Sequence, residues 1–300
     1  MPGITDWLNS VGDRRREASE EAAALILSHY RQKWPNLRPI ELNRLAALLN
    51  VKLREVPELE GEARLAPTPG GFLLLFSRGA RQRNYARFRT SISHELAHTL
   101  FYEQLGPGEI PRRLLAPSEK EEQFCFDVAR RILAPRWMLA NLGLLTEGDA
   151  GVIFKALTRM LGLSWSVAAR LIVEDYALVL AVAGRWRKTG KRWEPVVGEF
   201  FFTPELSEES FVGLRQAVRA WLEGKETVGL DCKIAARLGA SGKSAFVIAQ
   251  VPSEHPQEAL ADVEGFWQAN LNRWRGSIPT EADKSTDSST DQGTLRYGSP

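Results

Sequence analysis

Two histidines and a glutamate within residues 93–99 have the spacing of a metal site. His94 and His98 lie four residues apart, so on a helix their imidazoles face the same way and can hold one metal ion. Glu95 lies beside them, where a carboxylate can take a proton from a water whose pKa a bound Zn²⁺ lowers to about 7. The chain has four histidines, and two fall at this spacing, so we favour a metal site over an accidental pair. The pattern predicts metal-assisted hydrolysis.

A third ligand is expected from the helix that residues 117–133 predict. Its buried stripe is predicted to contain Cys125, Phe126, Ala129, Ile132 and Leu133. Glu122 projects into the middle of this stripe, where a carboxylate is costly unless a cation or several donors meet it. Glu122 is therefore the predicted third ligand, and Cys125 a small core residue. Two alternatives stay open: Glu121, three residues after Ser118 as in a capping box, and Glu119, which the helix dipole favours.

Apolar periodicity and turn residues predict the elements around this site. The expected helices are 20–34, 39–49 and 82–104, and the expected strands are 51–56, 63–66 and 72–76. An edge strand beside the motif helix could bind an extended peptide as an additional strand. The arginines at positions 81, 83, 87 and 89 are expected to form a solvated basic face.

A second group of helices is predicted after the metal helices. A short helix is expected at 136–142, followed by helices 150–161 and 166–173 joined by a tight turn. This layout is close to a helix-turn-helix. We favour a packing role over DNA reading, because Arg170 is the only basic residue on the second helix.

The remaining chain predicts a small α+β accessory domain whose role the sequence does not reveal. Strands are expected at 177–183, 193–202 and 245–251, and helices at 208–223 and 257–274. Residues 185–192 carry five cations next to tryptophans. We favour a solvated hairpin tip there over a surface that follows a phosphate backbone. Residues 239–244 (GASGKS) are similar to a phosphate loop, but Arg237 replaces its first glycine, so nucleotide binding is rejected.

Composition sets the remaining limits. The 300 residues, 44% of them hydrophobic, suffice for one large or two ordinary domains. Two cysteines favour a reducing compartment, and neither a signal peptide nor a long apolar segment is evident, so a cytoplasmic protein without membrane contact is expected. A net charge of +2 does not by itself argue for nucleic acid. The predicted organisation is a flexible lead (1–19), a metal-binding domain (20–135), the helix pair (136–175), the accessory domain (176–277) and a disordered tail (278–300).

Two segments resemble the ImmA/IrrE metallopeptidases. These are residues 87–98 (RFRTSISHELAH) and 122–135 (EQFCFDVARRILAP), and the resemblance covers about residues 20–175. It implies an α+β fold with a zincin-like helical domain and a small antiparallel sheet, in which His94, His98 and Glu122 hold one divalent metal. Glu95 then stands in the position of the general base.

The resemblance also implies a function. Members are gluzincin-like peptidases of bacteria, and the characterised type cleaves a helix-turn-helix repressor to release transcription. This chain departs from the usual pattern at Phe126 (Asn in most members), Ala134 (Met) and Tyr102 (often a further His). Phe126 removes a polar group that could orient a ligand, which puts metal affinity in doubt.

The leading hypothesis is therefore a zinc-type endopeptidase acting on such a repressor. Manganese or iron would suit the same ligands. Tyr102, one turn beyond His98, is a candidate wall of the site or donor to the oxyanion. The alternative is a regulator in which the metal is structural or sensory and which binds DNA or a partner without cleaving it.

Overall fold

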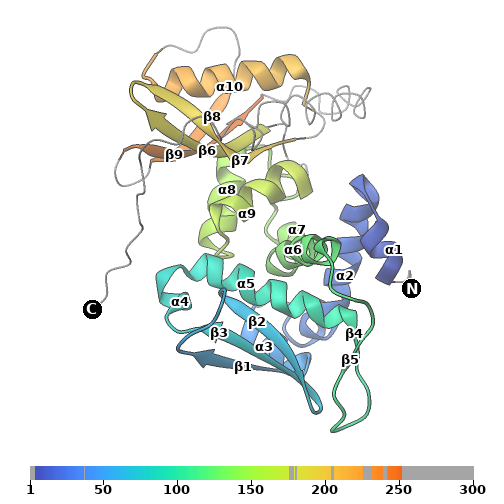
Figure 1. Ribbon diagram of the computed structural model, residues 1–300. Helices are drawn as coiled ribbons and strands as arrows, with labels where there is room; N and C mark the ends of the chain where they lie inside the picture. The colour runs from blue at the N-terminus through green and yellow to red at the C-terminus, as the bar shows by residue number, and fades with distance from the viewer. Residues whose placement is uncertain are drawn as a thin grey trace. The chain divides into compact units, whose positions relative to one another are not determined.

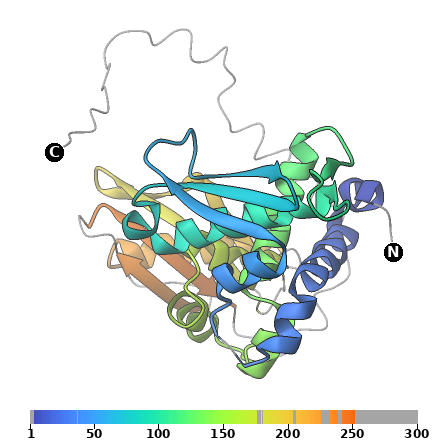
Figure 2. The ribbon, with the colours of Figure 1, turned by 90° about the horizontal axis from the view of Figure 1, so that it is seen from below.

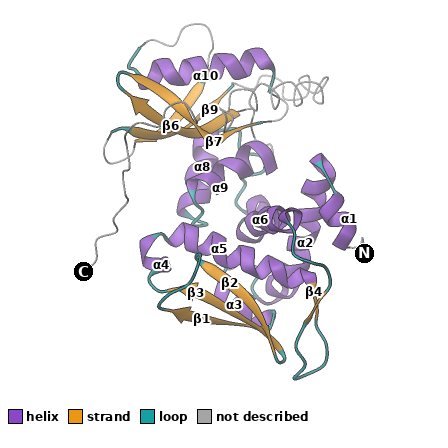
Figure 3. Ribbon diagram, in the orientation of Figure 1, coloured by secondary structure: helices purple, strands orange, loops and turns teal. Residues whose placement is uncertain are grey.

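The computed structural model describes residues 4–36, 38–175, 179, 181–203, 206–225, 232–238 and 242–251. The fold is α+β, with helices that pack on a three-stranded and a four-stranded sheet (Figures 1 and 3). A two-stranded ribbon (102–113) connects the helix that carries the motif to the helix 119–133. Within the described residues, no helix is both long and apolar enough to cross a membrane.

The first helices cover one side of the metal-binding region. They are α1 (Ile4–Asn9), α2 (Gly12–Lys33) and α3 (Leu42–Leu48). The expected flexible lead is wrong for residues 4–19, because apolar and ionic contacts hold this segment. Trp7 stacks on Phe124 with ring centroids 5.9 Å apart, and Arg15 forms an ion pair with Asp127 at 2.5 Å.

The three-stranded sheet forms from the strands that the sequence predicted. β1 (Val51–Val56), β2 (Ala63–Thr68) and β3 (Gly71–Ser77) lie in the order β1-β3-β2. β3 runs parallel to β1 and antiparallel to β2, so the sheet is mixed and not wholly antiparallel as expected. Alternating apolar residues identify a strand but do not show which strand it pairs with. Here the loop after β1 leads to β2 at the far edge of the sheet, and β3 then returns to the place between β1 and β2.

Two glycines set the β2–β3 hairpin and its neighbourhood. Gly70 has φ 77°, as the third residue of a tight turn requires. A Cβ on Gly71 would lie 2.2 Å from the carbonyl oxygen of Asn50, so only glycine fits there. β2 is an edge strand of this sheet and contacts the helix that carries the motif, residues 85–97. In Figure 2 the three strands, coloured blue to cyan, face the viewer.

The motif helix is shorter than predicted. The expected helix 82–104 is replaced by α4 (Ala80–Arg83), α5 (Tyr85–Ala97) and a 3₁₀ turn (His98–Phe101). Asn84 begins α5 by accepting a hydrogen bond from the backbone N–H of Arg87 at 3.0 Å. After the turn the chain becomes extended in β4 (Tyr102–Glu103), which pairs with β5 (Arg112–Arg113).

The second metal-site helix forms as expected. α6 (Glu119–Leu133) is capped by Ser118, whose Oγ accepts from the backbone N–H of Glu121 at 3.2 Å. α6 packs against α5 and α2, and α7 (Arg136–Asn141) follows it. The predicted helices 117–133 and 136–142 are thus confirmed.

The four-stranded sheet has helices on both faces. Its order is β7-β6-β9-β8, from β6 (Ala181–Thr189), β7 (Arg192–Phe202), β8 (Lys233–Leu238) and β9 (Ser244–Gln250). α10 (Glu208–Leu222) covers one face, and the pair α8 (Ala150–Arg159) and α9 (Trp165–Arg170) packs on the sheet as well, followed by a π-helical turn (Leu171–Asp175) (Figure 1). β8 was not among the strands that the sequence predicted.

One apolar core joins these parts. It runs from Trp7 through α5 and α6 to Phe201 and Ile248, across the boundaries predicted at 135 and 175. Residues 1–256 accordingly cluster as one compact unit. The predicted helix 257–274 and tail 278–300 lie outside the described residues.

Candidate metal centre

Two helices bring three ligand atoms together. Nε2 of His94 and Nε2 of His98 are 3.1 Å apart, although His98 begins the 3₁₀ turn after α5. From α6, one oxygen of Glu122 lies 3.1 Å from Nε2 of His94 and the other lies 3.5 Å from Nε2 of His98. Ligand atoms about 2.1 Å from a tetrahedral zinc ion are about 3.4 Å from one another. The three side chains therefore fit one such ion.

Glu122 reaches this place from the solvent side of α6. Its side chain is 54% exposed, so the expectation that it lies in a buried stripe is wrong. The helix turns Glu121, Phe124 and Val128 inward instead. Phe126, which the sequence also placed in the core, is 48% exposed. The structure nevertheless brings Glu122 to both histidines, while Glu119 remains exposed at the start of the helix.

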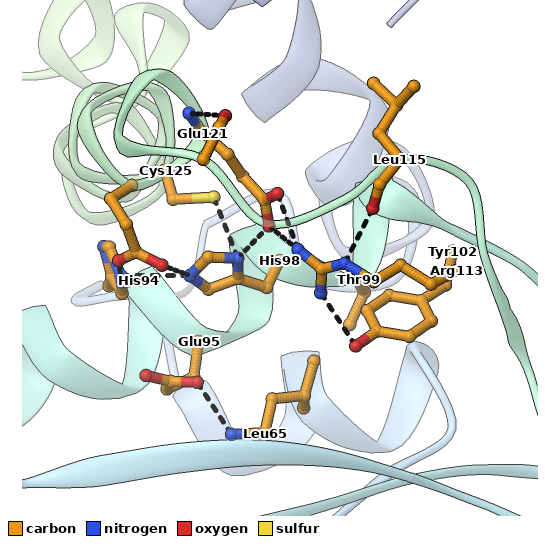
Figure 4. Close-up of polar contacts among 12 residues, drawn as sticks. Leu65, His94, Glu95, His98, Thr99, Tyr102, Arg113, Leu115, Glu121 and Cys125 are labelled. Atoms are coloured by element: carbon orange, nitrogen blue, oxygen red, sulfur yellow. Dashed lines mark hydrogen bonds and ion pairs between the residues drawn. The ribbon is translucent and has the colours of Figure 1, made fainter.

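Glu121 supports His98 from behind. Its carboxylate oxygen lies 2.7 Å from Nδ1 of His98, and the side chain is 1% exposed (Figure 4). We assign the proton to Nδ1, which donates to Glu121 and leaves the Nε2 lone pair facing His94 and Glu122. Such a carboxylate fixes both the tautomer and the orientation of the ring.

Arg113 holds Glu121 in turn, and no pattern in the sequence had indicated this contact. Its Nη2 donates to both Glu121 oxygens, at 2.7 and 2.6 Å, and its Nε donates to the carbonyl of Leu115 at 2.8 Å. Arg113 comes from β5, which a pattern search for helices and long strands does not find. The capping-box spacing pointed to Glu121 but suggested a different use for its carboxylate.

Tyr102 belongs to this supporting chain. Its hydroxyl accepts from Nη1 of Arg113 at 2.9 Å, and the guanidinium carbon lies 5.2 Å from its ring centroid. In Figure 4, Tyr102 lies beside Arg113, on the Nδ1 side of His98. The suggested role as oxyanion donor finds no support in this arrangement, because the ligand nitrogens face the other way.

Burial keeps His94 neutral. Burial, together with the neighbouring His98, lowers the pKa of His94 to about 4, and a neutral imidazole is the form that binds a metal. Its Nδ1 is buried without a hydrogen-bond partner within the described part of the chain. The Phe126 ring lies 4.0 Å from the His94 ring, centroid to centroid. Phe126 thus places an apolar ring, and no polar group, against His94.

Glu95 is positioned by the edge strand. Its Oε2 accepts a hydrogen bond from the backbone N–H of Leu65 in β2 at 2.7 Å (Figure 4). Burial raises the pKa of Glu95, and the neighbouring His98 opposes that rise. A carboxyl whose pKa is raised towards neutrality is a better base for water. The same hydrogen bond places an outward-facing N–H of the edge strand next to the ligands.

Cys125 is a buried thiol beside the site. Its Sγ lies 3.5 Å from Nδ1 of His98, and the residues His98, Glu121 and Cys125 also lie close enough to share a cation. Burial, with Glu121 nearby, raises the pKa of the Cys125 thiol well above its usual value. Because the thiolate is the metal ligand and Arg113 already neutralises Glu121, this second group fits a cation less well than the first.

A cavity is lined by Phe126, the neighbour of His94, and by none of the predicted ligands. Phe126, which contacts His94, also lines a cavity of about 480 Å³ together with Thr90, Val167 and Phe201. Its lining thus comes from α5, α6, α9 and β7. The cavity has room for a large side chain, and the Phe126 ring lies between it and His94.

The arginines before the motif do not form one solvated face. Arg87 is exposed and pairs with Glu62 at 2.5 Å, but Arg89 is 3% exposed. Its Nη1 donates to the carbonyl of Ile40 at 3.0 Å, and its guanidinium lies over Tyr85. The expectation is therefore wrong for Arg89, whose guanidinium is part of the packing between α5 and the segment before α3.

The helix pair packs on the four-stranded sheet. Arg170, the basic residue of α9, forms an ion pair with Glu174 at 3.1 Å and lies 4.9 Å from the Phe201 ring centroid. α9 contacts both β6 and β7. This agrees with the packing role that the sequence favoured.

Comparisons with known proteins assign no family. No family model matches the chain, and no curated protein matches it. A solved structure of a Mycobacterium tuberculosis transcriptional regulator is similar at 14% identity and a TM-score of 0.45, over 79% of this chain and 77% of that one. A likeness this distant carries no argument about function.

Proposed function

We propose that the protein is a metal-dependent endopeptidase with one divalent ion, zinc before manganese, held by His94, His98 and Glu122. The observation that carries the proposal is the convergence of these three donors within 4.8 Å. Glu95, on the same helix as His94, lies beside them and accepts a hydrogen bond from the edge strand β2. The resemblance to ImmA/IrrE peptidases suggests a helix-turn-helix repressor as substrate. A cytoplasmic location, where such a repressor acts, belongs to the same proposal.

The residues divide the chemistry between them. A divalent ion at this site would polarise a peptide carbonyl and lower the pKa of a water. Glu95 would accept a proton from the attacking water and return it to the departing amine. Glu121, through the Nδ1 proton of His98, would keep that imidazole in the ligating tautomer.

Substrate would bind along β2. An extended peptide can add to an edge strand through backbone hydrogen bonds, which do not depend on its side chains. The Leu65 N–H marks the point on β2 nearest to Glu95, 2.7 Å from its carboxylate. The cavity beside Phe126 would accept one side chain of the peptide and so contribute selectivity.

The variant Glu95→Gln tests the proposal. It should retain zinc, because the three ligands are untouched, and lose cleavage by at least about 10²-fold, the low end of what general-base catalysis contributes. The protein and its variant are each expressed with the repressor encoded beside the chain's gene, and intact masses of the repressor fragments are measured. Zinc content is measured on the purified proteins.

Glu119→Gln is the matched control, since Glu119 is exposed on the first turn of α6. It should cleave at the wild-type rate. His94→Ala should lose both zinc and cleavage. If Glu95→Gln produces the same fragments as wild type at the same rate, the peptidase mechanism is wrong, and the non-catalytic regulator becomes the better hypothesis.

A further inference from the structure

Exposed cations gather at one end of the four-stranded sheet, away from any group that the peptidase proposal uses. They are Arg185, Arg187, Lys188, Lys191, Arg192 and Lys243. β6 and β7 form a hairpin with Thr189 opposite Arg192, and the backbone N–H of Lys188 donates to the carbonyl of Lys243 at 2.9 Å. The β6–β7 tip and the turn before β9 therefore lie side by side, and cations from three segments surround one end of the sheet on both of its faces. This group of cations is called here the basic tip.

Few carboxylates lie in the described segments that form the basic tip. Glu194 is the one acidic residue within the described segments 185–194 and 242–244, and it lies opposite Arg187. Glu223, at the end of α10 near Trp193, is already bound by Lys225 at 2.6 Å. Within the described part of the chain, no ion pair joins Arg187, Lys191 or Arg192 to a carboxylate. Like charges held this close repel one another unless a polyanion binds them.

The surroundings of the basic tip decide which polyanion fits. Trp186 and Trp193 are 1% and 4% exposed, so neither can stack on an unpaired base, as single-strand binding requires. No large hydrophobic side chain is exposed within these described segments, whereas binding to a membrane surface combines cations with inserted apolar groups. A two-stranded ribbon bearing cations has the width to enter the major groove of a duplex.

We propose that the basic tip binds the phosphate backbone of double-stranded DNA without sequence preference. Its arginines and lysines contact phosphates on both sides of a groove, and counterion release drives the association. The inference reverses the preference for a solvated hairpin, because the pairing of β6 with β9 adds Lys243 to the cations that are contiguous in sequence. It is independent of the metal site, and it would bring the chain to the DNA on which a repressor is bound.

Fluorescence anisotropy of the full chain with a labelled duplex of about two helical turns tests the proposal. Affinity should fall steeply between about 50 and 200 mM salt, with a slope of log K against log salt of about −3 to −4 if four phosphates are contacted. Lys191→Gln/Arg192→Gln should weaken binding by at least about tenfold and make the slope less negative by about 1.8. The matched control, Lys52→Gln/Arg54→Gln, removes the same charge from exposed positions of β1 and should bind as wild type.

Each other result overturns the proposal. The proposal is wrong if wild type does not bind the duplex at the lower salt concentration. It is also wrong if both double variants lose affinity equally, because that result shows an effect of total charge. Binding to phosphatidylserine vesicles in place of DNA would assign the surface to a membrane. Circular dichroism checks that each variant is folded. The single variant Arg187→Gln is a milder change and should make the slope of log K against log salt less negative by about 0.9.

Discussion

Glu121 is the residue whose role is most sharply testable apart from the ligands. It contacts His98 and Arg113 and no solvent. In Glu121→Gln, a neutral amide replaces the charged carboxylate that accepts the hydrogen bond from Nδ1 of His98. Arg113 also loses its ion-pair partner. Zinc affinity should fall by about 10- to 100-fold, the range for groups that orient metal ligands. Competition with a chelator of known zinc affinity measures this.

The control for Glu121→Gln is its helical neighbour Glu119→Gln, where affinity should stay within about twofold of wild type, because Glu119 contacts Gln123 on the surface. Arg113→Lys should fall between the two, since a lysine keeps the charge but not the fork that binds both oxygens. Unchanged affinity in Glu121→Gln would mean that the tautomer of His98 is fixed by something else.

The sequence indicated which residues to propose for the metal site, but not which side chains surround them. His94, Glu95 and His98 were proposed as site residues from their spacing alone, which is a local signal. Glu122 was selected for a reason that is wrong, because an apolar Phe126 pulled the helical wheel one residue out of phase. The Phe126 ring lies against His94 and not in the core, and no pattern of hydrophobicity distinguishes these two uses of a phenylalanine.

Asp149 shows how an element depends on its first residue. As N-cap of α8 it accepts from the backbone N–H groups of Val152 and Gly151, at 3.1 and 2.9 Å, and it pairs with Lys233 at 3.4 Å. The hydrogen bond from Val152, more than the others, lowers the pKa of Asp149. The ionised carboxylate therefore stabilises the fold above its unfolded pKa of about 3.9.

Asp149→Ala should lower the free energy of unfolding by about 1 kcal/mol at neutral pH. A lowered folded-state pKa means that the unfolded chain binds the proton first as pH falls. The difference between wild type and variant should consequently shrink below about pH 4. Urea denaturation at several pH values measures it, with Glu58→Ala, exposed in the loop after β1, as a control that should change little. A difference that is constant with pH would contradict the capping role.

Elements were predictable where their signals are local. α10 and β9 match the predicted ranges 208–223 and 245–251 to within one residue, because their periodicity and caps lie within the element. The motif helix ended too late in the prediction, since the β4–β5 pairing competes with helix for Tyr102 and is visible only in three dimensions. β8 was missed for the same reason: residues 233–238 become a strand by pairing with β9.

At the scale of the whole molecule, the helix pair α8–α9 joins the metal region to the four-stranded sheet. Phe154 stacks on Phe246 with centroids 5.5 Å apart, and Trp165 lies 5.8 Å from the same ring. The side chain of Gln250, in β9, accepts from the backbone N–H of Ala150 at 2.8 Å. A domain boundary at 175, as the sequence predicted, would cut through these contacts.

A chain that ends at Asp175 should therefore fail to fold cooperatively. It exposes Phe154, Trp165 and the buried face of α9, and losing even one such aromatic contact from a core costs about 3–5 kcal/mol, a large part of a typical domain's stability. Urea denaturation followed by circular dichroism should lose its sharp transition, and a dye for exposed apolar surface should bind. A chain that ends at Pro256, where the first compact unit ends, is the control and should keep the wild-type transition. If the shorter chain instead unfolds in one sharp transition and binds zinc as tightly as the full chain, the metal region is an independent domain and the shared core is not needed to position its ligands.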